Sequence, residues 1–135
     1  VQQIGLNAEA VCGCVWVDDW SVHPEVADHL ASEFAAHYRH ADGHSHIHGA
    51  NLGCSAQAYR RSGGFQPLAS DEDVAFVRAL QEAGVSVMFS AAPRVVTSAR
   101  ADHRAPRGFG ATVLQSAERL SAELANALVP RPRAA

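Results

Sequence analysis

The stretch from residue 63 to residue 84 constrains the chain most, because three successive acidic residues stand there at the expected start of a helix. It reads GGFQPLASDEDVAFVRALQEAG. Ser70 predicts an N-cap, and Asp73 three residues later gives the form of a capping box, with carboxylates at the positive end of the helix dipole. Gly84 predicts the helix end through a left-handed residue. Three apolar residues at three-residue spacing predict the buried face: Val74, Val77 and Leu80.

Two interpretations of these acidic residues follow from local physics. Carboxylates are common in the first turn of a helix, so they can serve only as a cap. Alternatively, one of them is a working group, held rigidly at the mouth of a cleft.

Composition predicts one compact soluble domain. The chain has 135 residues, 47% of them hydrophobic, and a net charge of −3. We expect the domain to span residues 1–129 and a disordered tail to occupy residues 130–135, which begin with Pro130. All 11 basic residues are arginine, and no basic field argues for a nucleic-acid partner.

The sequence predicts neither a membrane span nor a disulfide scaffold. No apolar run reaches the roughly 20 residues that a membrane helix needs, and the N-terminus lacks a signal pattern, so a cytoplasmic location is expected. Cys12 and Cys14 are too close in sequence to pair naturally, and Cys54 is the third cysteine. Reduced thiols are therefore expected.

Periodicity outlines an α/β arrangement. Residues 11–17 predict an interior strand that is apolar on both faces. Asp18 and Asp19 follow, either as solvated residues that close the strand or as contacts to a metal or an acceptor. Pro24 opens a helix with apolar residues at every fourth position, and this helix should pack against the sheet. Residues 85–89 and 94–97 predict two short strands around Ala91-Ala92-Pro93, and a final helix follows, with apolar positions 113, 117, 120, 124 and 127. Ser55 predicts the cap of a short helix that Gly63 ends.

Three histidines alternate in the segment His44-Ser45-His46-Ile47-His48. In an extended segment all three imidazoles lie on one side, which is compatible with a zinc or nickel site. The other interpretations are a polar strand edge or the rim of an active site. Asn51 follows closely, and its amide could hold a substrate hydroxyl or satisfy local backbone groups.

Several motifs occur in order from Gly49 to Phe109. They are Gly49-Ala50-Asn51-Leu52, then Tyr59 to Phe65 with its Gly63-Gly64-Phe65, then Glu72-Asp73 with Val77 to Leu80, then Arg94 to Arg100, then Arg104-Ala105 and Gly108-Phe109. This ordered set resembles the second half of family 2 glycosyltransferases. The resemblance implies part of a GT-A fold, a Rossmann-like three-layer sandwich with a mixed sheet flanked by helices, whose N-terminal nucleotide-binding half is missing from this chain.

The resemblance also implies a reaction and roles for residues. A sugar passes from a nucleotide-diphosphate sugar donor to an acceptor hydroxyl with inversion, and Asp73 of the Glu-Asp pair is the general base. Glu72 orients a neighbouring group or the acceptor. His48, beside a strand that borders donor and acceptor, positions a hydroxyl together with Asn51.

A divalent metal, Mg²⁺ or Mn²⁺, belongs to the same resemblance. Asp71-Glu72-Asp73 has the Asp-x-Asp pattern of the family's metal motif, but it opens a helix after Gly-Gly-Phe, whereas the family's motif ends an earlier strand. We therefore expect the main ligands before Val1, with His103 as a weak further candidate. Three arginines could instead neutralise the diphosphate through forked hydrogen bonds: Arg100, Arg104 and Arg107.

Two alternatives to the enzyme remain at this level. One is a noncatalytic metal-binding or interaction module that uses His44, His46 and His48. The other is a degenerate glycosyltransferase domain kept as a scaffold. Whichever of the three functions applies, the incomplete sheet can expose an edge strand or an apolar patch, so a homo-oligomer is possible.

Overall fold

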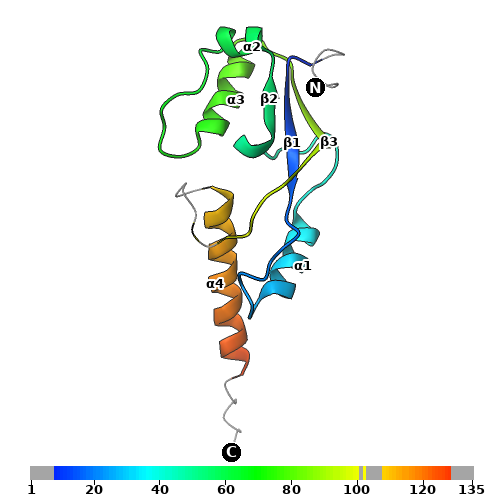
Figure 1. Cartoon of the computed structure of the whole chain (residues 1–135), viewed down its shortest axis with the longest axis vertical. Coiled ribbons are helices and arrows are strands. Elements are labelled where there is room, and N and C mark those ends of the chain that lie inside the picture. The colour runs from blue at the N-terminus through cyan, green and yellow to red at the C-terminus, as the bar shows by residue number, and fades with distance from the viewer. Residues whose placement is uncertain (1–7, 101, 103–107, 129–135) are drawn as a thin grey trace, which may run out of the picture.

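The computed structural model describes residues 8–100, 102 and 108–128, and it confirms the α/β class (Figure 1). A small mixed sheet is flanked by helices. The elements follow in this order: β1 (Ala10–Trp16), α1 (Ala27–His37), the short 3₁₀ helix η1 (Gly49–Asn51), β2 (Leu52–Cys54), α2 (Ala56–Arg61), α3 (Glu72–Glu82), β3 (Val87–Val96) and α4 (Phe109–Ala127). Among the described helices, none combines the length and the apolar character needed to cross a bilayer.

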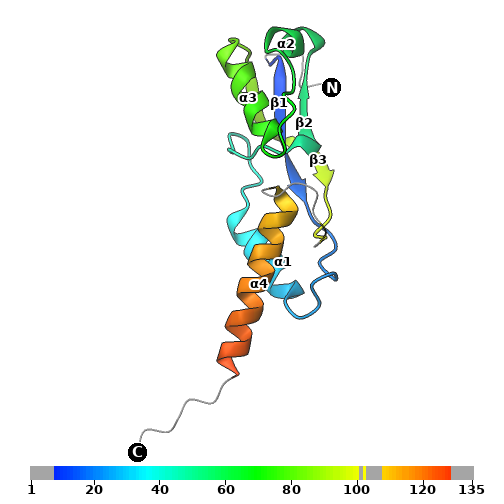
Figure 2. The ribbon, with the colours of Figure 1, turned by 90° about the vertical axis from the view of Figure 1, so that its left-hand side faces the viewer.

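The sheet has the order β2-β1-β3. β1 pairs antiparallel with β2 and parallel with β3, which makes it the central strand. Its residues from Ala10 to Val15 are all buried, as the apolar pattern on both faces predicts. α2 and α3 lie beside one end of the sheet, whereas α1 and α4 lie beyond the other end, where β1 and β3 lead into them (Figures 1 and 2).

The prediction of two strands around Ala91-Ala92-Pro93 is wrong, because the chain forms one strand there, with a large bulge. Cys12 pairs with Phe89 and Cys14 pairs with Arg94, so β3 contains three more residues than β1 over this stretch. The bulged backbone is held by Asp42, whose Oδ1 accepts hydrogen bonds from Ser90 Oγ at 2.9 Å and from the Ala91 N–H at 2.8 Å. The bond from the Ala91 N–H satisfies a backbone group within the bulge, where the ladder is interrupted.

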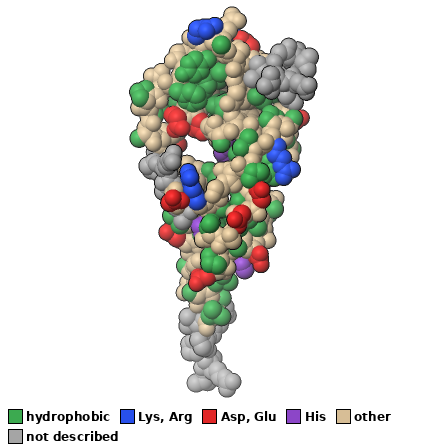
Figure 3. All heavy atoms as spheres, viewed as in Figure 1, with side chains coloured by type: hydrophobic (Ala, Val, Ile, Leu, Met, Phe, Trp, Pro, Cys, Tyr) green, Lys and Arg blue, Asp and Glu red, His purple; other side chains and the backbone are tan. Residues whose placement is uncertain are grey.

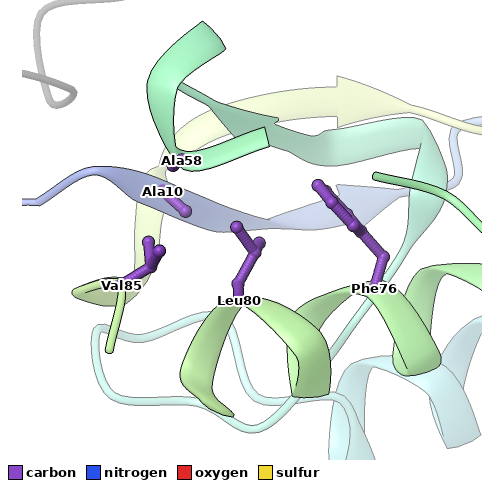
Figure 4. Close-up of a cluster of buried hydrophobic side chains, with 5 residues drawn as sticks. All are labelled: Ala10, Ala58, Phe76, Leu80 and Val85. Carbon is purple, nitrogen blue, oxygen red and sulfur yellow. The ribbon is translucent and has the colours of Figure 1, made fainter. Parts of the chain in front are cut away.

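The main core lies between the sheet and α2 and α3 (Figure 4). Its buried members are Ala10, Ala58, Phe76, Leu80 and Val85. Val77 and Leu80 are buried as predicted, but Val74 is 40% exposed and Phe76 occupies the core in its place. The reason is tertiary: the Phe76 ring packs against Phe65 and Tyr59 from the preceding segment.

The predicted capping box at Ser70 is wrong. The N-cap of α3 is Asp71, in a left-handed conformation with φ 61° and ψ 24°, and it makes no side-chain capping bond. Ser70 Oγ is buried without a hydrogen-bond partner. Asp73 bonds to a distant backbone group instead, as described below. The end of α3 agrees with the prediction, since Gly84 has a φ of 69°.

The helix expected from Pro24 begins later, at Ala27. The prediction that it packs against the sheet is wrong. Val26 and Leu30 pack with Ala117 of α4 in a second core, joined by Trp20, Leu120 and Leu124. Both views show α1 and α4 side by side (Figures 1 and 2). Two partly apolar helices thus bury their faces against each other.

Two of the remaining helix predictions are confirmed. The Ser55 side chain accepts a hydrogen bond from the Ala58 N–H at the start of α2, and Gly63 has a φ of 80° just after its end. α4 buries Val113 and Ala117 as expected, although it begins at Phe109. The predicted tail at 130–135 lies outside the described residues.

Candidate active site

A cavity of about 450 Å³ lies between the start of α3 and the pair of helices α1 and α4. Its walls come from α1, from the histidine segment, from the start of α3 and from the start of α4. Figure 3 shows the molecule hollowed near its middle, with acidic side chains above the hollow. Asp73, Glu72 and His48 line this cavity, so the structure brings together three of the residues that the sequence singled out.

The Asp73 carboxylate is fixed by two backbone groups. Its Oδ2 accepts a hydrogen bond from the Gly49 N–H at 2.8 Å, and its Oδ1 accepts one from the Val74 N–H at 2.8 Å. A carboxylate oxygen has two lone pairs, so each oxygen keeps the capacity to accept a further bond. A smaller hollow of about 120 Å³ on the side of Thr97 is also lined by Asp73 and His48. Asp73 therefore borders two adjacent spaces.

His48 is held by a short relay from the central strand. The Val15 N–H donates to the hydroxyl oxygen of Tyr38 at 3.0 Å, and that oxygen lies 2.8 Å from His48 Nε2. We assign the phenolic proton to this second bond, which places the imidazole proton on Nδ1. Burial lowers the pKa of His48 to about 4, His46 adds to this effect, and the charge of Asp73 opposes it. The ring is neutral at pH 7.

The three alternating histidines lie on one side of an extended segment, as predicted, but their rings are stacked. The centroids of His44 and His46 are 5.3 Å apart, and those of His46 and His48 are 6.1 Å apart. Stacked imidazoles present faces to one another, whereas a metal needs ring nitrogens that converge. His44 Nδ1 and His46 Nε2 also accept bonds from the backbone N–H groups of His46 and Arg39.

Within the described part of the chain, no three His, Cys, Asp or Glu residues are placed to hold a metal ion. The histidine segment therefore fits the interpretation as a rim of the cavity better than the metal-binding module. His46 lines the cavity and stacks on Tyr38 at 3.9 Å between ring centroids, with only 10° between the planes. His103 lies outside the described residues.

Asn51 clamps the bulge of the sheet. Its Nδ2 donates to the Cys14 carbonyl of β1 at 2.6 Å and to the Pro93 carbonyl of β3 at 2.9 Å, so it links the two strands at the register shift. Both amide protons are thus bound to backbone, and Asn51 does not line the cavity. The interpretation in which Asn51 satisfies backbone groups is the one that the geometry shows.

Of the three arginines predicted to bind phosphate at the cavity, only Arg100 belongs to the described residues. Arg100 is exposed and is not among its lining residues. Arg104 and Arg107 lie outside the described residues.

Cys12 carries a buried thiol near the site, and this thiol is a poor nucleophile at neutral pH. It has no exposed surface. Burial, and secondly the charge of Asp73, raise the pKa of the Cys12 thiol to about 11. The nucleophilic thiolate is therefore scarce at neutral pH. The three cysteines are all free, as the sequence predicts.

Sequence reasoning missed the aromatic wall of the site. Trp20, Phe34, Tyr38 and Phe109 line the cavity, and Phe34 contacts the rings of Trp20, Tyr38 and Phe109. The four-residue spacing of Phe34 and Tyr38 indicated a buried helix face. The extra signal was that aromatic side chains replace aliphatic ones toward the end of that face.

Comparison with known proteins gives no relative: no family model, no curated protein and no solved structure matches this chain.

Proposed function

We propose that the cavity is the acceptor site of an inverting glycosyltransferase in which Asp73 is the general base. The observation that carries the proposal is the position of Asp73: its carboxylate is fixed at the mouth of α3 by the Gly49 N–H and borders an aromatic cavity beside His48. This is the residue to which the resemblance to family 2 glycosyltransferases assigns that role. The GT-A fold belongs to the same proposal.

The proposed step balances as follows. The acceptor hydroxyl gives its proton to an Asp73 oxygen, and the acceptor oxygen attacks the anomeric carbon of the donor sugar from the face opposite the leaving group. The bond between that carbon and the nucleoside diphosphate oxygen breaks, and its electron pair leaves with the diphosphate. The products are a glycoside of inverted configuration, a nucleoside diphosphate and a proton held by Asp73.

The neighbouring residues align the acceptor for this step. His48 is neutral and is held in one orientation by Tyr38, so it can serve as a fixed hydrogen-bonding group for a sugar hydroxyl. Glu72 lines the cavity next to Asp73, and its carboxylate can accept a hydrogen bond from a second hydroxyl. The aromatic wall excludes water and offers flat apolar surface.

The divalent metal that the resemblance implies stays a prediction, with its main ligands expected before Val1. Among the described residues, no three His, Cys, Asp or Glu side chains are placed to hold a metal ion, and Asp73 is oriented by backbone donors. The leaving diphosphate needs positive charge, and in the proposal Arg100, Arg104 and Arg107 supply it through forked hydrogen bonds.

The test is sugar transfer by the full-length polypeptide that contains these residues, with panels of nucleotide sugars and acceptor alcohols. Asp73→Asn preserves the size of the side chain and an acceptor oxygen for Gly49, but it removes the base. We expect a loss of about 100-fold or more, the usual contribution of general base catalysis. Glu82→Gln, on the exposed last turn of the same helix, should leave transfer unchanged.

Undiminished transfer in Asp73→Asn would remove Asp73 from the base role. No transfer by the wild-type polypeptide with any donor of the panel would instead favour the degenerate scaffold.

A further inference from the structure

One peptide group of β1, between Cys14 and Val15, anchors both ends of the segment 48–51. Its carbonyl accepts the 2.6 Å hydrogen bond from Asn51 Nδ2, at the end of the segment. Its N–H donates to the Tyr38 hydroxyl at 3.0 Å, and this hydroxyl lies 2.8 Å from the imidazole Nε2 of the first residue of the segment. A peptide group is planar and stiff, so both ends of the segment are fixed relative to one rigid unit.

The Asp73 carboxylate is held by the middle of this segment. The Gly49 N–H donates to Asp73 Oδ2 at 2.8 Å. Gly49 begins η1, a turn of three residues that closes with the 2.9 Å hydrogen bond from the Asn51 N–H to the His48 carbonyl. The hydrogen-bond geometry of a 3₁₀ turn is poor, so the position of so short a turn depends on the groups that anchor it. The direction of the Gly49 N–H therefore follows from the anchors at both ends.

Asn51 joins η1 to two strands of the sheet. Its Nδ2 also donates to the Pro93 carbonyl of β3 at 2.9 Å. Gly13 leaves the space for this amide, because a Cβ at Gly13 would lie 2.2 Å from Asn51 Nδ2. Asn51 lines neither the cavity nor the smaller hollow, whereas Gly49 and Asp73 both line the smaller hollow. Any influence of Asn51 on the site therefore passes through the segment that it anchors.

We propose, on the basis of the function above, that Asn51 is a positioning residue for the general base. Its amide fixes η1 to the sheet, η1 directs the Gly49 N–H, and this N–H holds the Asp73 carboxylate in the orientation that takes the acceptor proton. Without the amide, the carboxylate gains rotational freedom, and productive alignment with the acceptor hydroxyl becomes rarer. Acceptor binding is kept, because Asn51 is not among the lining residues of the cavity.

The first test is a spectroscopic signature that needs no enzymatic activity. The resonance of the Gly49 amide proton in isotope-edited NMR spectra reports its hydrogen bond to the charged oxygen of Asp73. Asp73→Ala defines the position of this resonance without the bond, and we expect Asn51→Ala to move it toward that position. Ser55→Ala is the matched control: it removes a side-chain hydrogen bond to the backbone at the start of α2 and should leave the Gly49 resonance unchanged.

The second test is kinetic and uses the full-length polypeptide with a donor and an acceptor found in the panels above. We expect Asn51→Ala to lower kcat by about 10-fold or more and to change KM by less than about 2-fold, because alignment is lost while acceptor contacts are kept. Once Asp73→Asn has removed the base, Asn51→Ala should cost almost nothing further in a double-mutant cycle. A merely structural loss would lower the activity of both backgrounds equally. Ser55→Ala should leave kcat unchanged.

Asn51→Ser is the second variant if Asn51→Ala does not fold, because its hydroxyl can donate one of the two hydrogen bonds, and it should move the Gly49 resonance in the same direction. An unmoved Gly49 resonance in the folded variant would overturn the inference, as would additive losses in the kinetic cycle. Failure of the proposed function gives a different result. If no transfer depends on Asp73, the enzyme is rejected, whereas a moved Gly49 resonance still supports the positioning of the carboxylate by Asn51.

Discussion

The backbone N–H of Gly49 donates a 2.8 Å hydrogen bond to Oδ2 of Asp73, which joins the end of the histidine segment to the first turn of α3. The two residues are 24 positions apart in the sequence. Because of this bond, the Asp73 carboxylate does not take part in a capping box and is fixed beside the cavity. The electrostatic benefit of an acid at the helix N-terminus is retained.

Replacing Asp73 by Ala and by Asn should separate the contribution of the hydrogen bond to stability from the contribution of the charge. Asp73→Ala loses both and should cost about 1–2 kcal/mol of unfolding free energy, whereas Asp73→Asn keeps an acceptor for Gly49 and should cost less than about 1 kcal/mol. Urea denaturation measures both values. Asp28→Asn in the exposed first turn of α1 is the control for charge at a helix start. Equal losses in Asp73→Ala and Asp73→Asn would show that the bond to Gly49 contributes nothing.

Tyr38→Phe should destabilise the protein by about 1–3 kcal/mol, because it leaves the N–H of the buried Val15 without its acceptor. It also removes the partner of His48 Nε2. Tyr59→Phe is the matched control, since the exposed Tyr59 hydroxyl accepts only a long bond of 3.4 Å. Equal unfolding free energies for the two variants would contradict the relay.

Stability should fall as the pH is lowered from about 6.5 to about 4. Burial lowers the pKa of His48 from 6.5 to about 4. Between these pH values, His48 binds a proton in the unfolded chain but not in the folded protein. The full stability is therefore present above pH 6.5 and is lost as the pH falls through the folded pKa. The loss attributable to His48 should be about 2–3 kcal/mol.

Urea unfolding at a series of pH values measures this dependence, and His48→Gln provides the comparison. His46, whose pKa is lowered by burial and by His44, adds to the slope in both proteins. The difference between the two slopes thus reports His48 together with its coupling to His46. Parallel profiles for wild type and variant would disprove the assignment.

The close approach of Asn51 to Gly13 predicts a coupled pair of mutations. A Cβ at Gly13 would lie 2.2 Å from Asn51 Nδ2, so Gly13→Ala should destabilise the protein by several kcal/mol, in the range of about 2–4. Asn51→Ala should cost about 1–3 kcal/mol because it unpairs the Cys14 and Pro93 carbonyls. With Asn51→Ala in place, the clash disappears and Gly13→Ala should cost much less. Additive losses in a double-mutant cycle would refute the clamp.

The sequence determined the local elements of this protein. The interior strand followed from apolar residues on both faces, the start of α2 from Ser55, and the ends of α2 and α3 from Gly63 and Gly84. It also placed the three imidazoles on one side of their segment. These features depend on neighbours within a few residues, and local preference and periodicity report such interactions directly.

The tertiary structure decided which groups meet. Asp73 bonds to Gly49 instead of forming a capping box with Ser70. Asn51 spans a bulge that no local sequence pattern predicts. α1 packs on α4 rather than on the sheet. Each of these outcomes depends on a partner more than 20 residues away. A side chain with several possible partners takes the one that packing brings within hydrogen-bond distance, and that distance is a property of the folded chain.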